Sequence, residues 1–165
     1  WQTNPTTDRS AETTFVVDTT PGTPTDDRKG LLKFDISSIP TTARVTRAYL
    51  ELYIAAEGQG IIAYKMLVPW NGSSTHTSLG GVSNDGVKAA VAESWRNGVN
   101  LDTVVNVTWK SNVSVADVQG WVSNPSNNQG WLLLGMDTAT GDGMQFPGKV
   151  GTTQSQRPKL YVEYV

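Results

Sequence analysis

The sequence predicts an all-β protein, a jelly-roll-like antiparallel β-sandwich with one or two short helices. Three observations support this prediction. Seven short runs alternate between apolar and polar residues, which is the pattern of strands that bury one face. Glycine, proline, asparagine or serine bounds each run. Helical spacing of apolar residues is confined to two short segments, so strands dominate and are expected to pack in layers.

The clearest run covers residues 44–56, in which apolar residues alternate with Tyr49, Glu51 and Tyr53. One face of this strand is expected to be buried, and the other face to carry the two tyrosines. The remaining runs are rich in β-branched or aromatic residues. They span residues 13–17, 30–36, 60–68, 104–110, 130–137 and 158–165.

Residues 86–98 are predicted to form a short amphipathic helix. Val87, Val91 and Trp95 follow one another at intervals of four residues, and an Asn-Gly pair at 97–98 supplies a C-terminal stop. The apolar stripe of this helix should face the sandwich.

A second short helix is predicted after Ser114. This residue lies three positions before Asp117, which is the spacing of a capping box. Val115, Val118 and Val122 share one helical face, and an Asn-Pro pair at 124–125 ends the helix.

The composition predicts one domain over residues 1–165 and excludes several classes of protein. The chain has 38% hydrophobic and 17% charged residues, a net charge of -2, no cysteine and one histidine. Thiolate chemistry, cysteine-bound zinc and a multi-histidine metal site are therefore excluded. The charge balance indicates no nucleic-acid partner, and no apolar stretch is long enough for membrane insertion. Abundant threonine, serine and asparagine without cysteine suit an extracellular, cell-surface or virion-surface protein.

Three segments rich in glycine, proline, threonine and serine have little periodicity and are expected to be loops. They cover residues 19–29, 71–85 and 138–156. Loops of this length are uncommon inside a compact domain unless they bind something, so they are the first place to look for function.

Four passages and two aromatic positions together resemble a known family. The four passages read GLLKFDISSIPTTARVTRAYLELY at 30–53, VADVQGWV at 115–122, NNQGWLLL at 127–134 and RPKLYVEY at 157–164. The two aromatic positions, Tyr64 and Trp70, lie between the first and the second passage. In this combination the chain resembles the DNRLRE-domain family, which is related to the family-96 carbohydrate-binding modules. The resemblance covers about two thirds of the chain.

The resemblance implies an extracellular accessory module with a jelly-roll-like fold and no catalytic residues. Such modules occur beside polysaccharide-degrading enzymes, on cell surfaces and in viral structural proteins. The chain departs from the family at its start, where part or all of the first strand is missing, so a sheet edge should be exposed. It departs again over residues 71–101, where a Gly/Ser/Thr loop and the predicted helix replace the usual acidic, tryptophan-bearing pattern.

Exposed aromatic side chains are the expected sugar-binding groups, because a pyranose ring stacks its C–H face on an indole or phenol. Trp70, before an Asn-Gly loop, and Trp1, at the terminus, are candidates for this role. Tyr49 and Tyr53 could form a stacking platform, or they could equally face the second sheet. The other tryptophans are expected in the core: Trp95, Trp109, Trp121 and Trp131.

Two loops could supply oxygen ligands to a structural Ca²⁺. One loop holds Asp26 and Asp27, and the other holds Asp137 and Asp142. Ordinary turn acids are the alternative, because the EF-hand spacing is absent from the sequence. No cofactor is required by any motif.

No catalytic residue is assigned. A glycosidase needs two carboxylates across a cleft, and no spacing among the 15 acidic residues selects a pair. His76 lies in NGSSTHTS without a nucleophile elbow and is expected to be a solvated loop histidine. Lys33, Arg44 and Arg47 could serve an anionic polymer or form a solvated strand face.

The sequence therefore favours a non-catalytic module that binds a polysaccharide. The alternative is a structural subunit, such as a capsid decoration, fibre or filament protein, that joins neighbouring protein subunits through an open sheet edge. A homo-oligomer or a larger assembly would follow from this alternative.

Overall fold

A computed structural model describes residues 4–18, 27–58, 60–97, 105–136 and 143–165. Its helical elements are α1 (Val115–Ser123) and two short 3-10 turns, Pro125–Asn127 and Gln154–Gln156. The strands of the described part are β1 (Thr14–Val17), β2 (Gly30–Leu32), β3 (Val45–Ile54), β4 (Ile61–Met66), β5 (Ala89–Arg96), β6 (Val107–Asn112), β7 (Trp131–Gly135), β8 (Met144–Pro147) and β9 (Lys159–Tyr164).

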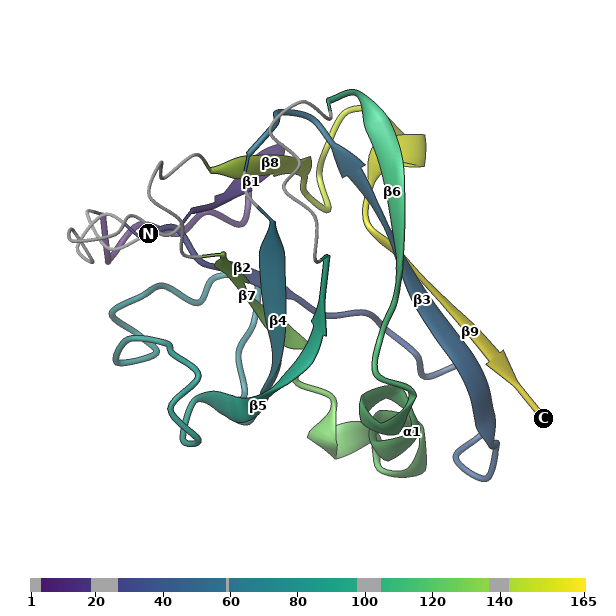
Figure 1. The fold of residues 1–165 in the computed structure, drawn as a ribbon. Helices are drawn as coiled ribbons and strands as arrows, with labels where there is room; N and C mark the ends of the chain where they lie inside the picture. Colours follow the sequence, from purple (N-terminus) through teal and green to yellow (C-terminus); the bar gives the residue numbers. More distant parts are fainter. Residues whose placement is uncertain (1–3, 19–26, 59, 98–104, 137–142) are drawn as a thin grey trace.

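The strands form three antiparallel sheets, with the orders β2-β7-β4-β5, β6-β3-β9 and β1-β8. The four-stranded and three-stranded sheets are the two layers of a sandwich (Figure 1). The small sheet extends the layer of β3, because the backbone N–H of Ala55 donates to the carbonyl of Gln145 at 2.8 Å. The predicted all-β sandwich is therefore confirmed.

Alternation along β3 supplies one wall of the core. Leu50, Leu52 and Ile54 are fully buried, whereas Tyr49 and Tyr53, which alternate with them, are partly exposed on the outer face. Since successive side chains of a strand point to opposite faces, this burial pattern follows directly from the sequence.

A cluster of tryptophans fills the middle of the core. The ring of Trp131 meets Trp121 at a centroid distance of 4.7 Å and Trp95 at 6.0 Å, both edge to face. Trp131 Nε1 donates to Asp117 Oδ2 at 3.3 Å, so its polar atom has a buried partner. Trp109 packs partly buried against the same cluster. The predicted core positions of these four tryptophans are confirmed.

Strand β7 is buried on both of its faces. Trp131, Leu132 and Leu133 are all fully buried, although neighbouring side chains must point in opposite directions. Trp131 and Leu133 belong to the sandwich core, whereas Leu132 belongs to a second apolar cluster with Val82. Val82 lies in the connection between β4 and β5, residues 67–88. This connection therefore covers the outer face of the four-stranded sheet.

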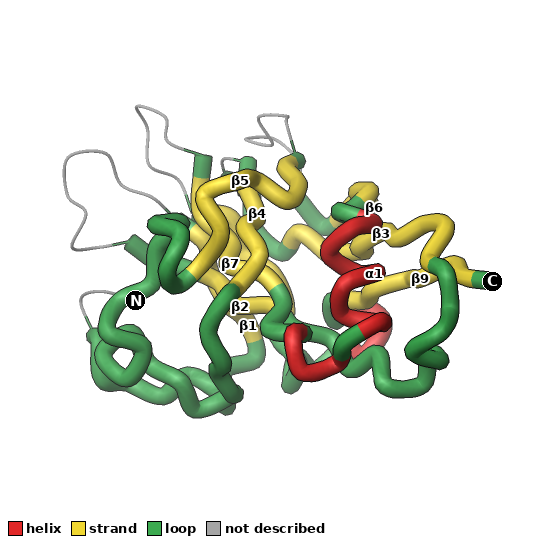
Figure 2. The backbone as a smooth tube through the Cα atoms, turned by 90° about the horizontal axis from the view of Figure 1, so that it is seen from below, coloured by secondary structure: helices red, strands yellow, loops and turns green. Residues whose placement is uncertain are grey.

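The predicted helix after Ser114 is confirmed as α1. The Ser114 hydroxyl accepts the backbone N–H of Asp117 at 3.1 Å, and the cap at Asn124 ends the helix. The helix lies at one end of the sandwich between the two layers (Figure 2). In the described part of the chain, no helix has the length and apolar character needed to cross a bilayer.

The predicted helix over residues 86–98 is wrong, because this segment contains strand β5. Trp95 points inward with 5% of its surface exposed, but Val87 and Val91 are 67% and 68% exposed. The interval of four residues therefore marks no buried face. Register shifts along the pairing of β5 with β4 disturb the two-residue alternation, which explains why the sequence pattern of a strand was hidden.

The predicted loop over residues 138–156 contains strand β8, and the predicted strand 30–36 is shorter than expected. Strand β8 has four residues and gains its partner β1 from a distant part of the chain, so its sequence carries no detectable period. Strand β2 ends at Leu32. Asp35 accepts the backbone N–H of Ser37 at 2.9 Å in the following turn, as expected for a short acid after a strand.

Two glycines give a matched test of this backbone. Gly130 has a φ of 67°, and a Cβ there would lie 2.1 Å from the carbonyl oxygen of Leu32. We expect Gly130→Ala to lower the free energy of unfolding by at least about 2 kcal/mol. Gly120 is exposed in α1 with open space around it, so Gly120→Ala should raise the free energy of unfolding by about 0.5 to 1 kcal/mol. Urea unfolding followed by tryptophan fluorescence measures both, and equal effects would contradict this backbone.

Candidate functional site

A cleft of about 720 Å³ lies at the open edge of the sandwich, beside β1 and β2. A backbone bridge between Asp18 and Arg28 holds one end of these two strands together. Beyond this bridge β1 pairs with β8 and β2 pairs with β7, so the strands belong to different sheets and the cleft opens between them. The β4–β5 connection and residues from the region 145–158 complete its wall.

The wall of the cleft is positive, although the whole chain carries a net charge of -2. Among the described lining residues one is acidic, Glu12, and it is paired with Arg9. The lysines and arginines of the wall come from distant parts of the sequence: Arg9, Arg28, Lys29, Lys33, Lys149 and Arg157. This excess of positive charge attracts anions.

Backbone carbonyls orient two of these cations. Lys29 Nζ donates to the carbonyl of Val82 at 3.0 Å, and Lys33 Nζ donates to the carbonyl of Trp70 at 3.1 Å. A carbonyl oxygen satisfies a donor without carrying a net charge, so it leaves the positive field of the cleft in place. Lys29 also lies 3.9 Å from the carboxylate of Asp27, which offsets part of its charge.

Trp70 lies in the cleft wall, and three contacts fix the position of its side chain. Its Nε1 donates to the carbonyl of Gln129 at 2.6 Å, and Lys33 Nζ lies 5.0 Å from the centroid of the indole. Its ring also packs against the second apolar cluster and remains partly exposed. The apolar part of the cleft lining continues through Phe15 and Leu31. An indole in a fixed position beside cations can contact the C–H face of a sugar that carries an acidic group.

A smaller hollow of about 470 Å³ lies next to the cleft and shares Trp70 with it. Its lining has no charged residue among those described; it consists of Pro69, Trp70, Asn71, Ser73, Ser74, Ser78 and Leu79. Hydroxyl and amide groups of this kind bind sugar hydroxyls. The surface around Trp70 is therefore cationic on one side and neutral on the other.

His76 is part of the cleft wall rather than the fully solvated loop residue that the sequence predicts. Its partial burial lowers the pKa of the imidazole below the ordinary value, and the positive charge of Lys29 lowers it further. These surroundings therefore favour the neutral imidazole, and an anion in the cleft would favour its protonated form.

Tyr49 and Tyr53 lie on the outer face of the three-stranded sheet, away from the second sheet. The ring of Tyr49 stacks on Tyr161 of β9 with a centroid distance of 4.7 Å and an angle of 6° between the planes. Lys110 Nζ, from the strand on the other side of β3, lies 6.0 Å from the centroid of Tyr49. Tyr53 Oη donates to Asn106 Oδ1 at 3.2 Å. The structure therefore does not bring the two tyrosines together with Trp70.

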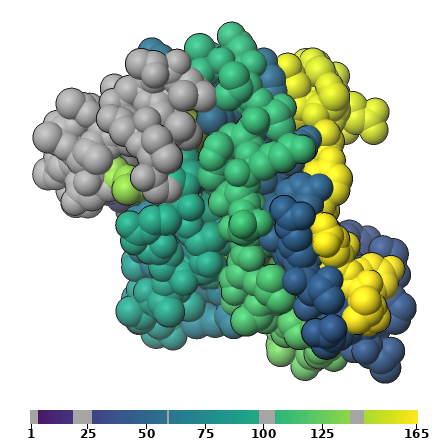
Figure 3. Space-filling view, turned by 45° about the vertical axis from the view of Figure 1, so that its right-hand side comes forward, coloured from purple at the N-terminus to yellow at the C-terminus, as the bar shows by residue number. Residues whose placement is uncertain are grey.

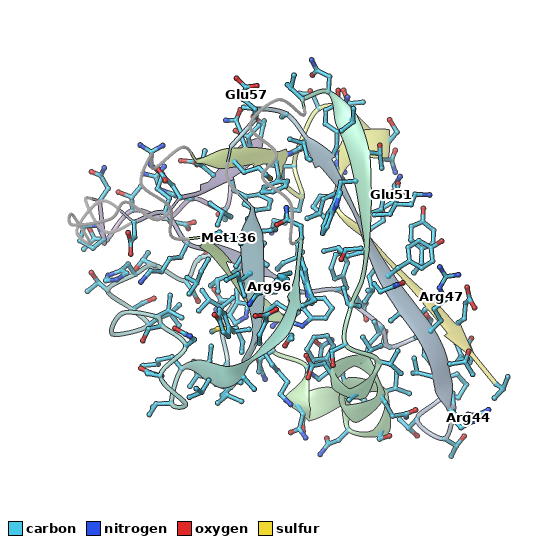
Figure 4. The ribbon with its side chains drawn as sticks, in the orientation of Figure 1. Arg44, Arg47, Glu51, Glu57, Arg96 and Met136 are labelled. Atoms are coloured by element: carbon cyan, nitrogen blue, oxygen red, sulfur yellow. The ribbon has the colours of Figure 1, made fainter. Side chains whose placement is uncertain are left out.

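The three cations that the sequence grouped also separate. Lys33 lines the cleft, whereas Arg47 lies on the outer face of β3 with its guanidinium 3.4 Å from the carboxylate of Glu163. Arg44 and Arg47 project from the same side of the molecule as Glu51 (Figure 4). These two arginines do not contribute to the cleft.

Several predicted site residues lie outside the described residues, namely Trp1, Asp26, Asp137 and Asp142. Asp27 is described and buried beside Lys29. Within the described ranges, no group of three or more His, Asp or Glu side chains has an arrangement that could hold a metal ion. Bound Ca²⁺ stays a prediction.

Sequence reasoning missed most of the cationic wall. Arg9, Lys149 and Arg157 are single charges in segments without a shared motif. They meet because the N-terminal segment and the region 145–158 converge on β1, β2 and the β4–β5 connection. The one sequence signal was Trp70 followed by a Gly/Ser/Thr-rich loop, and both contribute to the cleft wall.

Comparison of the sequence with protein-family models found no match, and comparison with curated proteins found none either.

The pKa of His76 tests the charge of the cleft. We expect the pKa to lie below the ordinary value of 6.5, and Lys29→Met should raise it because one positive neighbour is removed. His76 is the single histidine of the chain, so an NMR titration of its ring protons needs no assignment by mutation. A pKa above 6.5 would contradict the lowered pKa, and a pKa unchanged in Lys29→Met would show that Lys29 does not act on His76.

Proposed function

We propose that this protein is a non-catalytic module that binds an acidic polysaccharide in the cationic cleft. The observation that carries the proposal is the composition of the cleft wall: among its described residues, six are lysine or arginine and one, Glu12, is acidic, while Phe15 and Leu31 add apolar surface. Carboxylate groups of a polyuronate would pair with the lysines and arginines. The ring of the same sugar would contact Trp70.

The resemblance to the DNRLRE-domain family supports this proposal. Trp70, which the sequence selected as a sugar-binding candidate, lies in the cleft wall beside Lys33. The cleft wall offers the two kinds of group that bind sugars. An aromatic ring can contact the C–H face, and polar groups can bind the hydroxyls and the acid. An extracellular or virion-surface location is part of the same proposal.

Affinity electrophoresis in gels that contain polygalacturonate, alginate or neutral dextran tests the proposal. We expect the acidic gels to retard the protein, dextran to leave its mobility unchanged, and added NaCl to reduce the retardation because salt screens the cations. Retardation equal in all three gels, or in none, would contradict the proposal.

Matched variants locate the binding site. Lys149 is exposed at the cleft, and Lys110 is exposed on the outer face of the opposite sheet. We expect Lys149→Ala to weaken polyuronate binding about fivefold, or about 1 kcal/mol, and Lys110→Ala, which removes the same charge elsewhere, to leave it unchanged.

Trp70→Ala should weaken binding about tenfold, whereas Tyr53→Ala should not. Isothermal titration calorimetry measures the affinities, and thermal unfolding verifies that each variant is folded. Equal losses in Lys149→Ala and Lys110→Ala would indicate nonspecific charge attraction.

A further inference from the structure

Strand β9 is the edge of the three-stranded sheet and is open along its outer side. Among the described strands it pairs with β3 alone. Tyr161 and Tyr164 are 38% and 45% exposed, although aromatic side chains usually lose more surface than this. On the inner face, Leu160 and Val162 are only partly buried against the core. An edge of this kind is a template for another strand.

The backbone of β9 offers hydrogen-bonding groups to such a strand. Val165 exchanges two backbone hydrogen bonds with Arg44, 2.9 and 3.0 Å long. In an antiparallel ladder this pairing recurs at every second residue, so residues 163, 161 and 159 also direct their backbone groups toward β3. The N–H and C=O groups of Leu160 and Val162 therefore point away from β3, toward the open edge.

The outer face of β9 is complementary to itself. It reads Lys159, Tyr161, Glu163 from one end to the other, a cation, an aromatic ring and an anion. When this sequence is laid antiparallel against its own copy with the twofold axis at Tyr161, each Lys159 lies opposite a Glu163 and the two tyrosines lie opposite each other. In the same register, Leu160 lies opposite Val162 on the inner face, and these are the residues whose backbone groups point to the open edge.

We propose that two copies of this chain associate by antiparallel pairing of their β9 strands in this register. The result is one continuous six-stranded sheet, in which the open edge of each copy is the partner of the other. Opposite charges directly across an antiparallel pair stabilise it, and like charges destabilise it. The partner is therefore a second copy rather than an unrelated strand, because the charges of β9 are complementary to those of the same strand running in the opposite direction.

Rows of interacting side chains already present in each copy continue across this junction. Glu51 lies between Lys110 and Lys159, with N···O distances of 3.3 and 3.0 Å. The hydrogen bond from Lys159 lowers the pKa of Glu51, so the carboxylate is charged. In the dimer, Lys159 would be followed by Glu163 and Arg47 of the second copy, so charges of opposite sign alternate across both molecules. The stacked pair of Tyr49 and Tyr161 would continue in the same way into the second copy.

The other described edges do not match a second copy as well. Strands β1 and β2 have four and three residues, and β5 has register shifts that bend its edge. Strand β6 has Lys110 at the centre of its outer face, so antiparallel pairing about that residue would place like charges together. Strand β9 is regular over its six residues, apart from a shift opposite its end at Val45.

The dimer leaves the Trp70 end of the cleft accessible. Strand β9 runs along one flank of the molecule (Figure 3), and the β4–β5 connection lies on the opposite side (Figures 1 and 2). In each copy, Arg157 and Pro158 of the cleft wall directly precede β9, so one end of each of the two clefts lies near the junction and the Trp70 end lies away from it. A polymer with repeated acidic sugars could occupy both at once, which raises its apparent affinity.

Charge reversal on β9 tests the proposal by sedimentation velocity. We expect the natural chain to form dimers, and Glu163→Lys to raise the dimer dissociation constant about 30-fold, because two opposite-charge pairs become like-charge pairs. Lys159→Glu should do the same. An equimolar mixture of the two variants should dimerise again, because each strand then meets its opposite in charge. Glu57→Lys is the control, an exposed acid far from β9 (Figure 4).

Two further measurements complete the test. Amide hydrogen exchange of Leu160 and Val162 should slow as the protein concentration rises, and this dependence should be lost in Glu163→Lys. Thermal unfolding verifies that each variant keeps its fold. A natural chain that stays monomeric at NMR concentrations, a Glu163→Lys variant that dimerises as well as the natural chain, or a mixture that fails to recover would each overturn the proposal.

Discussion

The burial of β7 on both faces is the constraint on which the rest of the structure depends. One side of this strand completes the tryptophan core through Trp131, and the other side presents Leu132 outward. An exposed row of leucine-type side chains is unfavourable in water, at a cost of about 25 cal/mol for each Å² of apolar surface. The β4–β5 connection covers this row with Val82 and Trp70. A long polar-looking segment is thereby anchored to the sheet.

This anchoring also builds the cleft. The covering connection carries Trp70 and His76 to the edge where β1 and β2 separate. The same edge collects cations from the N-terminal segment, from the start of β2 and from the region after β8. Gathering like charges is unfavourable for the folded state, so an anion bound in the cleft would relieve this repulsion and stabilise the fold. Under the proposed function, ligand binding and stability are therefore coupled.

The two layers of the sandwich differ in how they meet the solvent. The four-stranded sheet is covered on both faces, whereas the three-stranded sheet has an outer face of paired charges and stacked tyrosines. On this second face each charge has a neighbour of opposite sign, so the surface has little net charge. A cationic cleft and an electrically balanced sheet therefore occupy opposite sides of one small protein.

The sequence predicted the regular parts of this fold because their physical cause is local. Alternation along β3 and the Ser114 cap of α1 act over two to four residues, so they are visible without the structure. Strand β5 was assigned to a helix because its register shifts remove the alternation and two exposed valines imitate a helical stripe. Strand β8 was missed because its four residues depend on β1 for their conformation.

The residue types of this chain by themselves determined that it is a β-sandwich with Trp70 at the start of a loop rich in glycine, serine and threonine. They could not determine that Arg9, Lys33 and Arg157 share one wall, because these cations are separated by many residues and no local rule links them. They also left open which way Tyr49 and Tyr53 face. Only the tertiary structure decided these points, since both depend on how the edges of the two sheets meet, and this is set by packing between distant strands.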